Sequence, residues 1–210
     1  MGSPLTPSAG GASDDPFGRC FAHRPQIGSE ERYRLGLAQR FSYVLPEPHL
    51  LRVVRRHSPL VELGAGTGYW TFLLRLMGAD VVAYDSAPVG GLRENRYHPD
   101  VRPWTDVIHG DLHMLSYHSD RCLFICWPPT YSALWEALSF YTGDWVIYVG
   151  DHGGRAARLA GLDDAFRRVE LHPAVAMDPA PDRPAELGVW RRRSWSAQPS
   201  SRPASGGVSV

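Results

Sequence analysis

A glycine-rich stretch near residue 65 constrains the fold more than any other feature of the chain. The sequence VELGAGTGYW places Gly64, Gly66 and Gly68 between an apolar run at 60–63, typical of a short strand, and a segment at 69–77 that is expected to be helical. Glycine is needed where a turn takes positive φ or where the backbone approaches a ligand closely, and the N–H groups at a helix N-terminus add hydrogen-bond donors. The context of strand, turn and helix therefore predicts an α/β fold that binds a ligand at this turn.

Strand and helix patterns alternate along the rest of the chain. Strands are expected at 60–63, 80–84, 105–109, 122–126 and 145–149, and helices at 69–77, 132–141 and 155–166. Two further segments, 166–171 and 187–192, flank a proline-rich loop and are expected to close the sheet as an antiparallel pair. The alternation predicts an α/β fold with a doubly wound, mostly parallel seven-stranded sheet.

The domain organisation follows from where apolar residues are scarce. Residues 1–25 and 194–210 are rich in Gly, Ser and Pro and are expected to be a disordered arm and a disordered tail. The segment 26–193 is expected to be a single domain, with 26–58 as an N-terminal helical cap. A hydrophobic content of 43% in 210 residues is enough to build one full core.

Composition excludes several functions. The formal net charge is zero and all 22 basic residues are arginine, because the sequence contains no lysine. The absence of lysine excludes Schiff-base and pyridoxal phosphate chemistry. The neutral balance argues against a nucleic acid partner.

Cysteine and hydropathy patterns predict a cytoplasmic protein. The three cysteines are an odd number and two of them lie inside the apolar run at 122–126, so no disulfide framework is expected. No apolar run approaches the roughly 20 residues that a membrane span needs, and no signal sequence begins the chain. A reducing cytosol without membrane attachment is the expected location.

The spacing of the glycines separates two classes of nucleotide cofactor. A dinucleotide fingerprint requires G-x-G-x-x-G, whereas this stretch is G-x-G-x-G and is preceded by the acidic residue Glu62. It strongly resembles motif I of the class I S-adenosylmethionine-dependent methyltransferases. The resemblance implies a Rossmann-like methyltransferase fold, with S-adenosyl-L-methionine bound along Glu62, Gly64, Gly66 and Gly68.

Two more acidic residues follow later strands. Asp85 comes directly after the second expected strand, where nucleotide-binding folds place an acid that accepts hydrogen bonds from ribose hydroxyls. By the same resemblance, Asp111 would lie near the adenine amine. Helix capping or turn formation is the alternative role for both. The short stretch HGDLH brings His109, Asp111 and His113 together, but no further ligand cluster accompanies them, and we expect no metal.

The fourth expected strand leads into Trp127, Pro128 and Pro129. Prolines end strand pairing and favour extended geometry in the residue before them, so a stiff connection is expected at the carboxyl end of the strand, where open α/β sheets bind ligands. The stretch resembles the Asn-Pro-Pro-aromatic or Asp-Pro-Pro-aromatic element of amino-methyltransferases. It differs because Trp127 replaces the polar acceptor and Thr130 stands in the aromatic position, with Tyr131 next.

The resemblance extends over roughly residues 40–193 to a group of small methyltransferase-like proteins that share the Trp-Pro-Pro strand end. The predicted catalytic residues are Trp127, Pro128 and Asp151, the last because it follows the fifth expected strand at the binding edge and could anchor a substrate cation. An indole can stack on a planar substrate or on a cation but accepts no hydrogen bond, while backbone carbonyls could orient an amine. The residues expected to bind substrate are Tyr43, Trp70, Trp127, Tyr131 and His152.

A pocket with so many aromatic rings and few charges favours methyl transfer to N or O of a small, planar or aromatic molecule, for example in specialised metabolism. Two alternatives stay open. One is a methyltransferase for RNA or a protein side chain, which would use the basic helix around 52–56, and the other is a non-catalytic module that binds S-adenosylmethionine. The sequence also leaves the methyl acceptor, the general base and the oligomeric state open.

Overall fold

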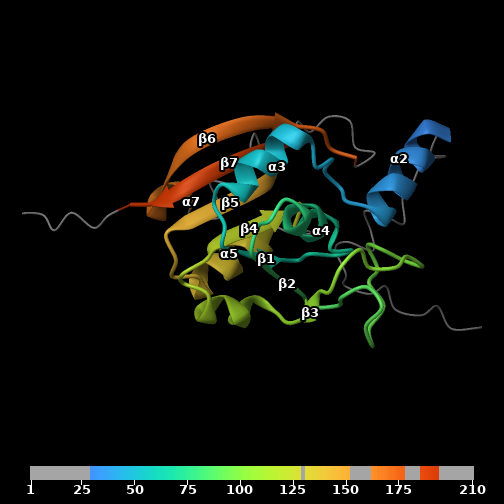
Figure 1. Ribbon diagram of the computed structural model, residues 1–210, viewed down its shortest axis with the longest axis horizontal. Helices are drawn as coiled ribbons and strands as arrows, with labels where there is room; N and C mark the ends of the chain where they lie inside the picture. Colours follow the sequence, from blue (N-terminus) through green and yellow to red (C-terminus); the bar gives the residue numbers. More distant parts are fainter. Residues whose placement is uncertain (1–28, 129–130, 152–161, 178–184, 194–210) are drawn as a thin grey trace, which may run out of the picture.

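The computed structural model describes residues 29–128, 131–151, 162–177 and 185–193 (Figure 1). The expected arm at 1–25, the expected tail at 194–210 and His152 lie outside these ranges. The side chain of Tyr131 also lies outside the description, although its backbone begins a helix.

Seven strands form one sheet in the order β3-β2-β1-β4-β5-β7-β6 (Figure 1). The strands are β1 (Leu60–Leu63), β2 (Val81–Asp85), β3 (Ile108–His109), β4 (Cys122–Cys126), β5 (Trp145–Asp151), β6 (Phe166–Ala174) and β7 (Ala185–Arg192). The first five are mutually parallel, whereas β7 runs antiparallel between β5 and β6. The order and directions confirm the predicted doubly wound sheet with a closing antiparallel pair.

The strand order reverses at β1. The chain moves outward from β1 to β2 and β3, then returns to β4 on the other side of β1. At such a reversal the loops that leave the two neighbouring strands diverge and open a crevice at the carboxyl ends of the strands. The glycine-rich turn leaves β1 at this edge, so its position in the sheet agrees with the expectation.

Helices cover both faces of the sheet (Figure 1). On one face, α3 (Pro48–Arg55) and α4 (Tyr69–Leu76) pack their buried residues on a core that includes Phe124 of β4 and Ile147 of β5. On the other face, η1 (Leu112–Tyr117), α5 (Tyr131–Phe140) and α7 (Leu162–Ala165) cover a second core that contains Trp190 of β7. The continuously apolar β4 is buried on both faces, as its sequence predicts.

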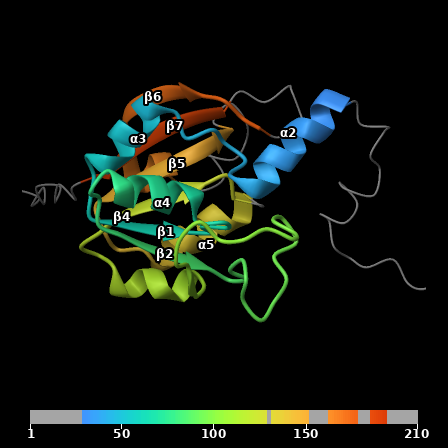
Figure 2. The same cartoon turned by 45° about the vertical axis from the view of Figure 1, so that its right-hand side comes forward.

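The N-terminal region has two parts with different roles. Helix α2 (Ser29–Arg40) lies to one side of the sheet (Figure 2). Helix α3 instead buries Leu50, Leu51, Val53 and Val54 in the first core. The helix that was expected within a cap is therefore an integral covering helix of the sheet.

Several boundaries differ from the sequence-based expectation. Strand β3 has two residues, both exposed, rather than the expected 105–109, because the chain before it packs on the glycine turn instead of on β2. The 3-10 helix η1 was not expected. Phe166 begins β6 and does not end a helix, and of the helix expected at 155–166 only Leu162–Ala165 lies in the described residues.

The described helices are short or carry polar residues. None of them is both long enough and apolar enough to cross a membrane.

Candidate functional site

The turn after β1 is held in shape by backbone hydrogen bonds to β2. The N–H groups of Gly64 and Ala65 both donate to the Tyr84 carbonyl, at 2.8 and 3.0 Å. All three glycines have positive φ, at 75° for Gly64, 55° for Gly66 and 74° for Gly68, the residue that precedes α4. L-residues with a side chain adopt this region only at a cost, so the backbone requires glycine at each position.

The three glycines differ in what surrounds them. A Cβ at Gly64 would meet no atom within 4 Å, and this residue is exposed. A Cβ at Gly66 would lie 2.5 Å from His98 Nε2, and one at Gly68 would lie 2.9 Å from a methyl group of Val107. Gly66 and Gly68 therefore admit neighbouring parts of the protein, whereas Gly64 alone leaves open space for a ligand.

Asp85, the last residue of β2, anchors the turn. Its buried carboxylate accepts hydrogen bonds from the N–H of Gly66 and from the N–H of Ala87, both at 2.8 Å. A carboxylate offers about four lone-pair positions. Two positions on Asp85 therefore remain for further donors at the same edge of the sheet.

Glu62 lies within β1, two residues before the first glycine of the turn. Its carboxyl is buried on the α4 face of β1 and accepts a hydrogen bond from the Thr71 hydroxyl. Burial raises the pKa of Glu62 to about 7, the nearby Asp85 charge adds to the rise, and the hydrogen bond from Thr71 opposes it. A buried acid beneath the turn could change its charge near neutral pH.

Trp127 leaves β4 with a backbone that the sequence did not predict. Its N–H donates to the Val149 carbonyl at 2.8 Å, which continues the pairing with β5, but its φ is 50°. The expectation of extended geometry before Pro128 is therefore wrong at this residue. A large side chain in the left-handed region is uncommon, and such strain persists only where the surroundings enforce it, often at functional sites.

The end of α2 and the segment that follows it are joined to the turn and to residues 98–104 by side-chain hydrogen bonds. Three consecutive carbonyls, of residues 39–41, accept hydrogen bonds from His98 Nδ1 at 2.7 Å, Trp104 Nε1 at 3.0 Å and Thr67 Oγ1 at 2.6 Å. The last carbonyls of a helix lack partners within the helix, so these donors satisfy the end of α2. We call the set of residues 39–43, Thr67, His98 and Trp104 the clasp.

Two of the predicted substrate residues are engaged by the protein itself. Tyr43 donates its hydroxyl to the Tyr97 carbonyl at 3.0 Å and lies edge-on to His98. Trp70 is buried in the first core, packs on Phe124 and donates to Ser42 Oγ at 3.0 Å. In this arrangement Trp70 is a core residue and does not line a pocket.

The remaining predicted site residues occupy three places. Asp151 ends β5 at the carboxyl edge, opposite Ala185, and Pro128 follows Trp127 at the same edge. Asp111 is exposed at the start of η1, where it accepts from the His113 backbone N–H at 3.0 Å, and this bond holds the pKa of Asp111 below its ordinary value. Capping is the role that its contacts show.

Two chemistries find no support in the described residues. Burial raises the pKa of Cys122 and of Cys126, so neither thiol is activated as a thiolate. Within the described ranges, no three or more His, Cys, Asp or Glu side chains gather to hold a metal ion.

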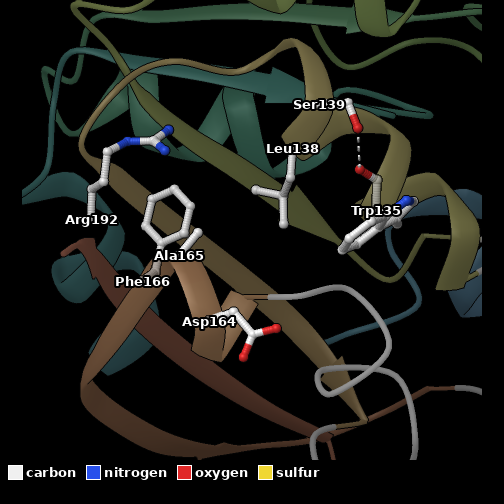
Figure 3. Close-up of a pocket in the computed structure, with 7 residues that line it drawn as sticks. All are labelled: Trp135, Leu138, Ser139, Asp164, Ala165, Phe166 and Arg192. Atoms are coloured by element: carbon white, nitrogen blue, oxygen red, sulfur yellow. Dashed lines mark hydrogen bonds between the residues drawn. The ribbon is translucent and has the colours of Figure 1, made fainter. Parts of the chain in front are cut away.

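A cavity of about 240 Å³ lies away from the turn (Figure 3). It is lined by α5, α7 and the adjoining ends of β6 and β7, with Trp135, Phe166 and Arg192 among its residues. Arg192 lies next to Arg191, which pairs with the first residue of β5. The cavity is therefore at the amino end of β5, opposite the edge at which parallel α/β sheets bind ligands.

Of the clasp, sequence reasoning singled out only Tyr43 and missed Ser42, Thr67, His98 and Trp104. No local motif marks them, because His98 lies 59 residues from the carbonyl that it contacts. The sequence held one indirect signal. A glycine at position 66 is needed if another group approaches its backbone closely, and in the structure that group is His98.

No family model and no curated protein sequence matches the chain. Among solved structures, protein 1320 of Thermoplasma acidophilum is 15% identical, over 80% of this chain and 100% of that one, with a TM-score of 0.49. Magnesium protoporphyrin IX methyltransferase of Synechocystis PCC 6803, crystallised with SAM, is 13% identical over 86% and 92% of the two chains, with a TM-score of 0.47. The 1,6-didemethyltoxoflavin-N1-methyltransferase of Burkholderia thailandensis is 15% identical over 84% and 82%, with a TM-score of 0.42.

Proposed function

We propose that this chain is a cytoplasmic S-adenosylmethionine-dependent methyltransferase that methylates N or O of a small, planar or aromatic molecule. One observation carries the proposal. At the strand-order reversal, the exposed Gly64, with no atom within 4 Å of a Cβ position, shares a sheet edge with the buried acid Asp85 and the strained Trp127. A nucleoside subsite and an aromatic subsite at one edge suit transfer between two bound molecules.

The residues at the turn fit this cofactor. The open side of Gly64 would admit the methionine and ribose portion, and Asp85 has acceptor positions left for ribose hydroxyls. Glu62, whose pKa burial raises to about 7, would supply negative charge near the turn once it ionises, and Asp111 would accept from the adenine amine. When bound, the cofactor supplies an electrophilic methyl group on a positively charged sulfur.

The strand-four end would hold the methyl acceptor. The indole of Trp127 presents a π face for a planar molecule, and the carbonyls of Trp127 and Pro128 can accept from an amine. Holding the acceptor at about 3–3.5 Å from the reacting carbon is itself a large part of such catalysis. We propose that Tyr43, Tyr131, His152 and Asp151 complete this subsite.

Methylation of RNA or a protein side chain is the second candidate function. It would use the basic residues around 52–56, but two of these arginines already bind other parts of the chain. Arg55 donates to the Met77 carbonyl at 2.7 Å, and Arg56 pairs with Glu170 at 2.9 Å. These contacts support the small-molecule proposal over a basic binding face. A non-catalytic module is the third candidate, and it differs by binding the cofactor without turnover.

The test is calorimetric titration of the full chain with S-adenosylmethionine, S-adenosylhomocysteine and NAD. We expect saturable binding of the first two ligands only. Asp85→Asn replaces one acceptor oxygen by a donor group and should weaken binding about tenfold or more. Ser139→Ala, at an exposed position beside the cavity at the amino end of β5, should leave binding unchanged.

A folded protein that binds neither sulfur nucleoside would overturn the proposal. If binding holds, release of S-adenosylhomocysteine is measured against a panel of planar amines and phenols. Trp127→Ala should reduce that turnover while leaving cofactor affinity within about twofold. Cofactor binding with no turnover on any acceptor class would favour the non-catalytic module.

A further inference from the structure

His98 has a defined tautomer. Its Nδ1 lies 2.7 Å from the Gln39 carbonyl oxygen, and a carbonyl can only accept, so Nδ1 carries the proton. Burial lowers the pKa of His98, which keeps the ring neutral near pH 7. Nε2 is therefore an acceptor with a free lone pair.

That lone pair faces the glycine turn. Nε2 lies 2.5 Å from the position that a Cβ would occupy on Gly66, nearer than any other atom of the ring. Within the described residues, no hydrogen bond reaches Nε2. His98 is half-buried, and an acceptor in such a setting gains a hydrogen bond when a ligand brings a donor to it.

The Asp85 side chain contacts the backbone of the same glycine. Its Oδ2 accepts from the Gly66 N–H at 2.8 Å, and its charge acts on the His98 ring. Two acceptor groups thus meet at Gly66, and each has lone pairs to spare. The complementary ligand group has two neighbouring donors, which is the chemistry of the vicinal diol of a ribose.

We propose that His98 is a cofactor-binding residue that, together with Asp85, accepts hydrogen bonds from the 2′- and 3′-hydroxyls of the bound nucleoside. The proposal rests on the proposed function and adds a residue contributed by the clasp. In this proposal the clasp orients the His98 ring, because the hydrogen bond from Nδ1 to the Gln39 carbonyl holds Nε2 toward the ligand.

The test measures binding of S-adenosylhomocysteine and its 2′-deoxy and 3′-deoxy analogues by calorimetry. For the native chain we expect each deoxy analogue to bind about 3- to 10-fold more weakly than the parent. The matched variant is His98→Asn, whose amide N–H₂ can still donate to Gln39 where Nδ1 did but which has no acceptor at the Nε2 position. In this variant the penalty for one of the two deoxy analogues should disappear, while the other penalty, which reports Asp85, remains.

Trp104→Phe is the structural control, because it removes the neighbouring clasp hydrogen bond to Arg40 but no acceptor. It should keep both penalties. The proposal fails if His98→Asn also keeps both, or if the two variants lose discrimination equally. A native chain that binds no S-adenosylhomocysteine would instead overturn the proposed function, so the two failures are distinguishable.

Discussion

At the scale of single residues, Glu62 shows how burial changes the pKa of a carboxyl group. A glutamate two residues before the first glycine of the turn is visible in the sequence, but only the structure places it beneath the turn with Thr71 as donor. Its pKa of about 7 in the folded chain, against 4.5 for an ordinary glutamate, means that the folded state binds more protons than the unfolded state between these pH values.

The stability of the protein should therefore fall as pH rises from about 5 to 8. The contribution is fully present below the unfolded pKa and is lost as pH passes the folded pKa, for a total on the order of 3 kcal/mol in the free energy of unfolding. Glu62→Gln should remove this part of the slope and be more stable than the native chain at pH 8. Urea unfolding of both proteins at pH 5 and pH 8 measures this difference. If the free energy of unfolding depends on pH in the same way for the native chain and for Glu62→Gln, the prediction is contradicted.

Alanine substitutions at Gly64 and Gly66 should differ in how much they destabilise the fold. Gly64→Ala meets no atom and costs only the left-handed backbone, about 1–2 kcal/mol, whereas Gly66→Ala adds a collision with His98 and should cost several kcal/mol. Denaturant midpoints measure the difference. We also expect Gly64→Ala, although folded, to lose cofactor affinity because its methyl group enters the ligand space. Equal destabilisation by the two variants would argue against the close contact with His98.

At the scale of elements, hydrogen bonds from single side chains fix how neighbouring segments meet. The Tyr141 hydroxyl lies 2.7 Å from both the Arg121 and Trp145 carbonyls and accepts from the Leu123 N–H at 3.2 Å. It therefore joins the end of α5 to the starts of β4 and β5. The sequence predicts these three elements but not the residue that connects them.

Tyr141→Phe keeps the ring and removes the hydroxyl, so the buried Leu123 N–H and the partly buried carbonyls of Arg121 and Trp145 lose this partner. We expect a loss of about 1–3 kcal/mol in the free energy of unfolding, with cofactor binding retained, because the site lies at the opposite edge of the sheet. Guanidinium unfolding and calorimetry check the two parts. A loss of binding without a loss of stability would place Tyr141 in the site instead.

At the scale of the whole molecule, the clasp couples the N-terminal segment to the ligand edge. Because the clasp joins residues 39–43 to the turn, a ligand that binds the turn should stabilise both. At a free S-adenosylhomocysteine concentration of 100 times its Kd, the folded state should gain about 2.7 kcal/mol. Amide hydrogen exchange at 39–44 should slow on binding, with NAD as the inert control, and unchanged exchange there would show that the clasp and the ligand are uncoupled.

The sequence by itself determined most of the strands, the doubly wound sheet with its antiparallel close, and the glycine turn after β1, because strand alternation and the backbone demands of glycine are local properties. Tertiary structure alone decided that β3 is only two residues, that Trp70 is a core residue, and that Trp127 has positive φ. It also decided which glycine stays open to a ligand and which admits His98. These outcomes depend on contacts between segments dozens of residues apart, and no local pattern encodes which distant side chain will fill a given space.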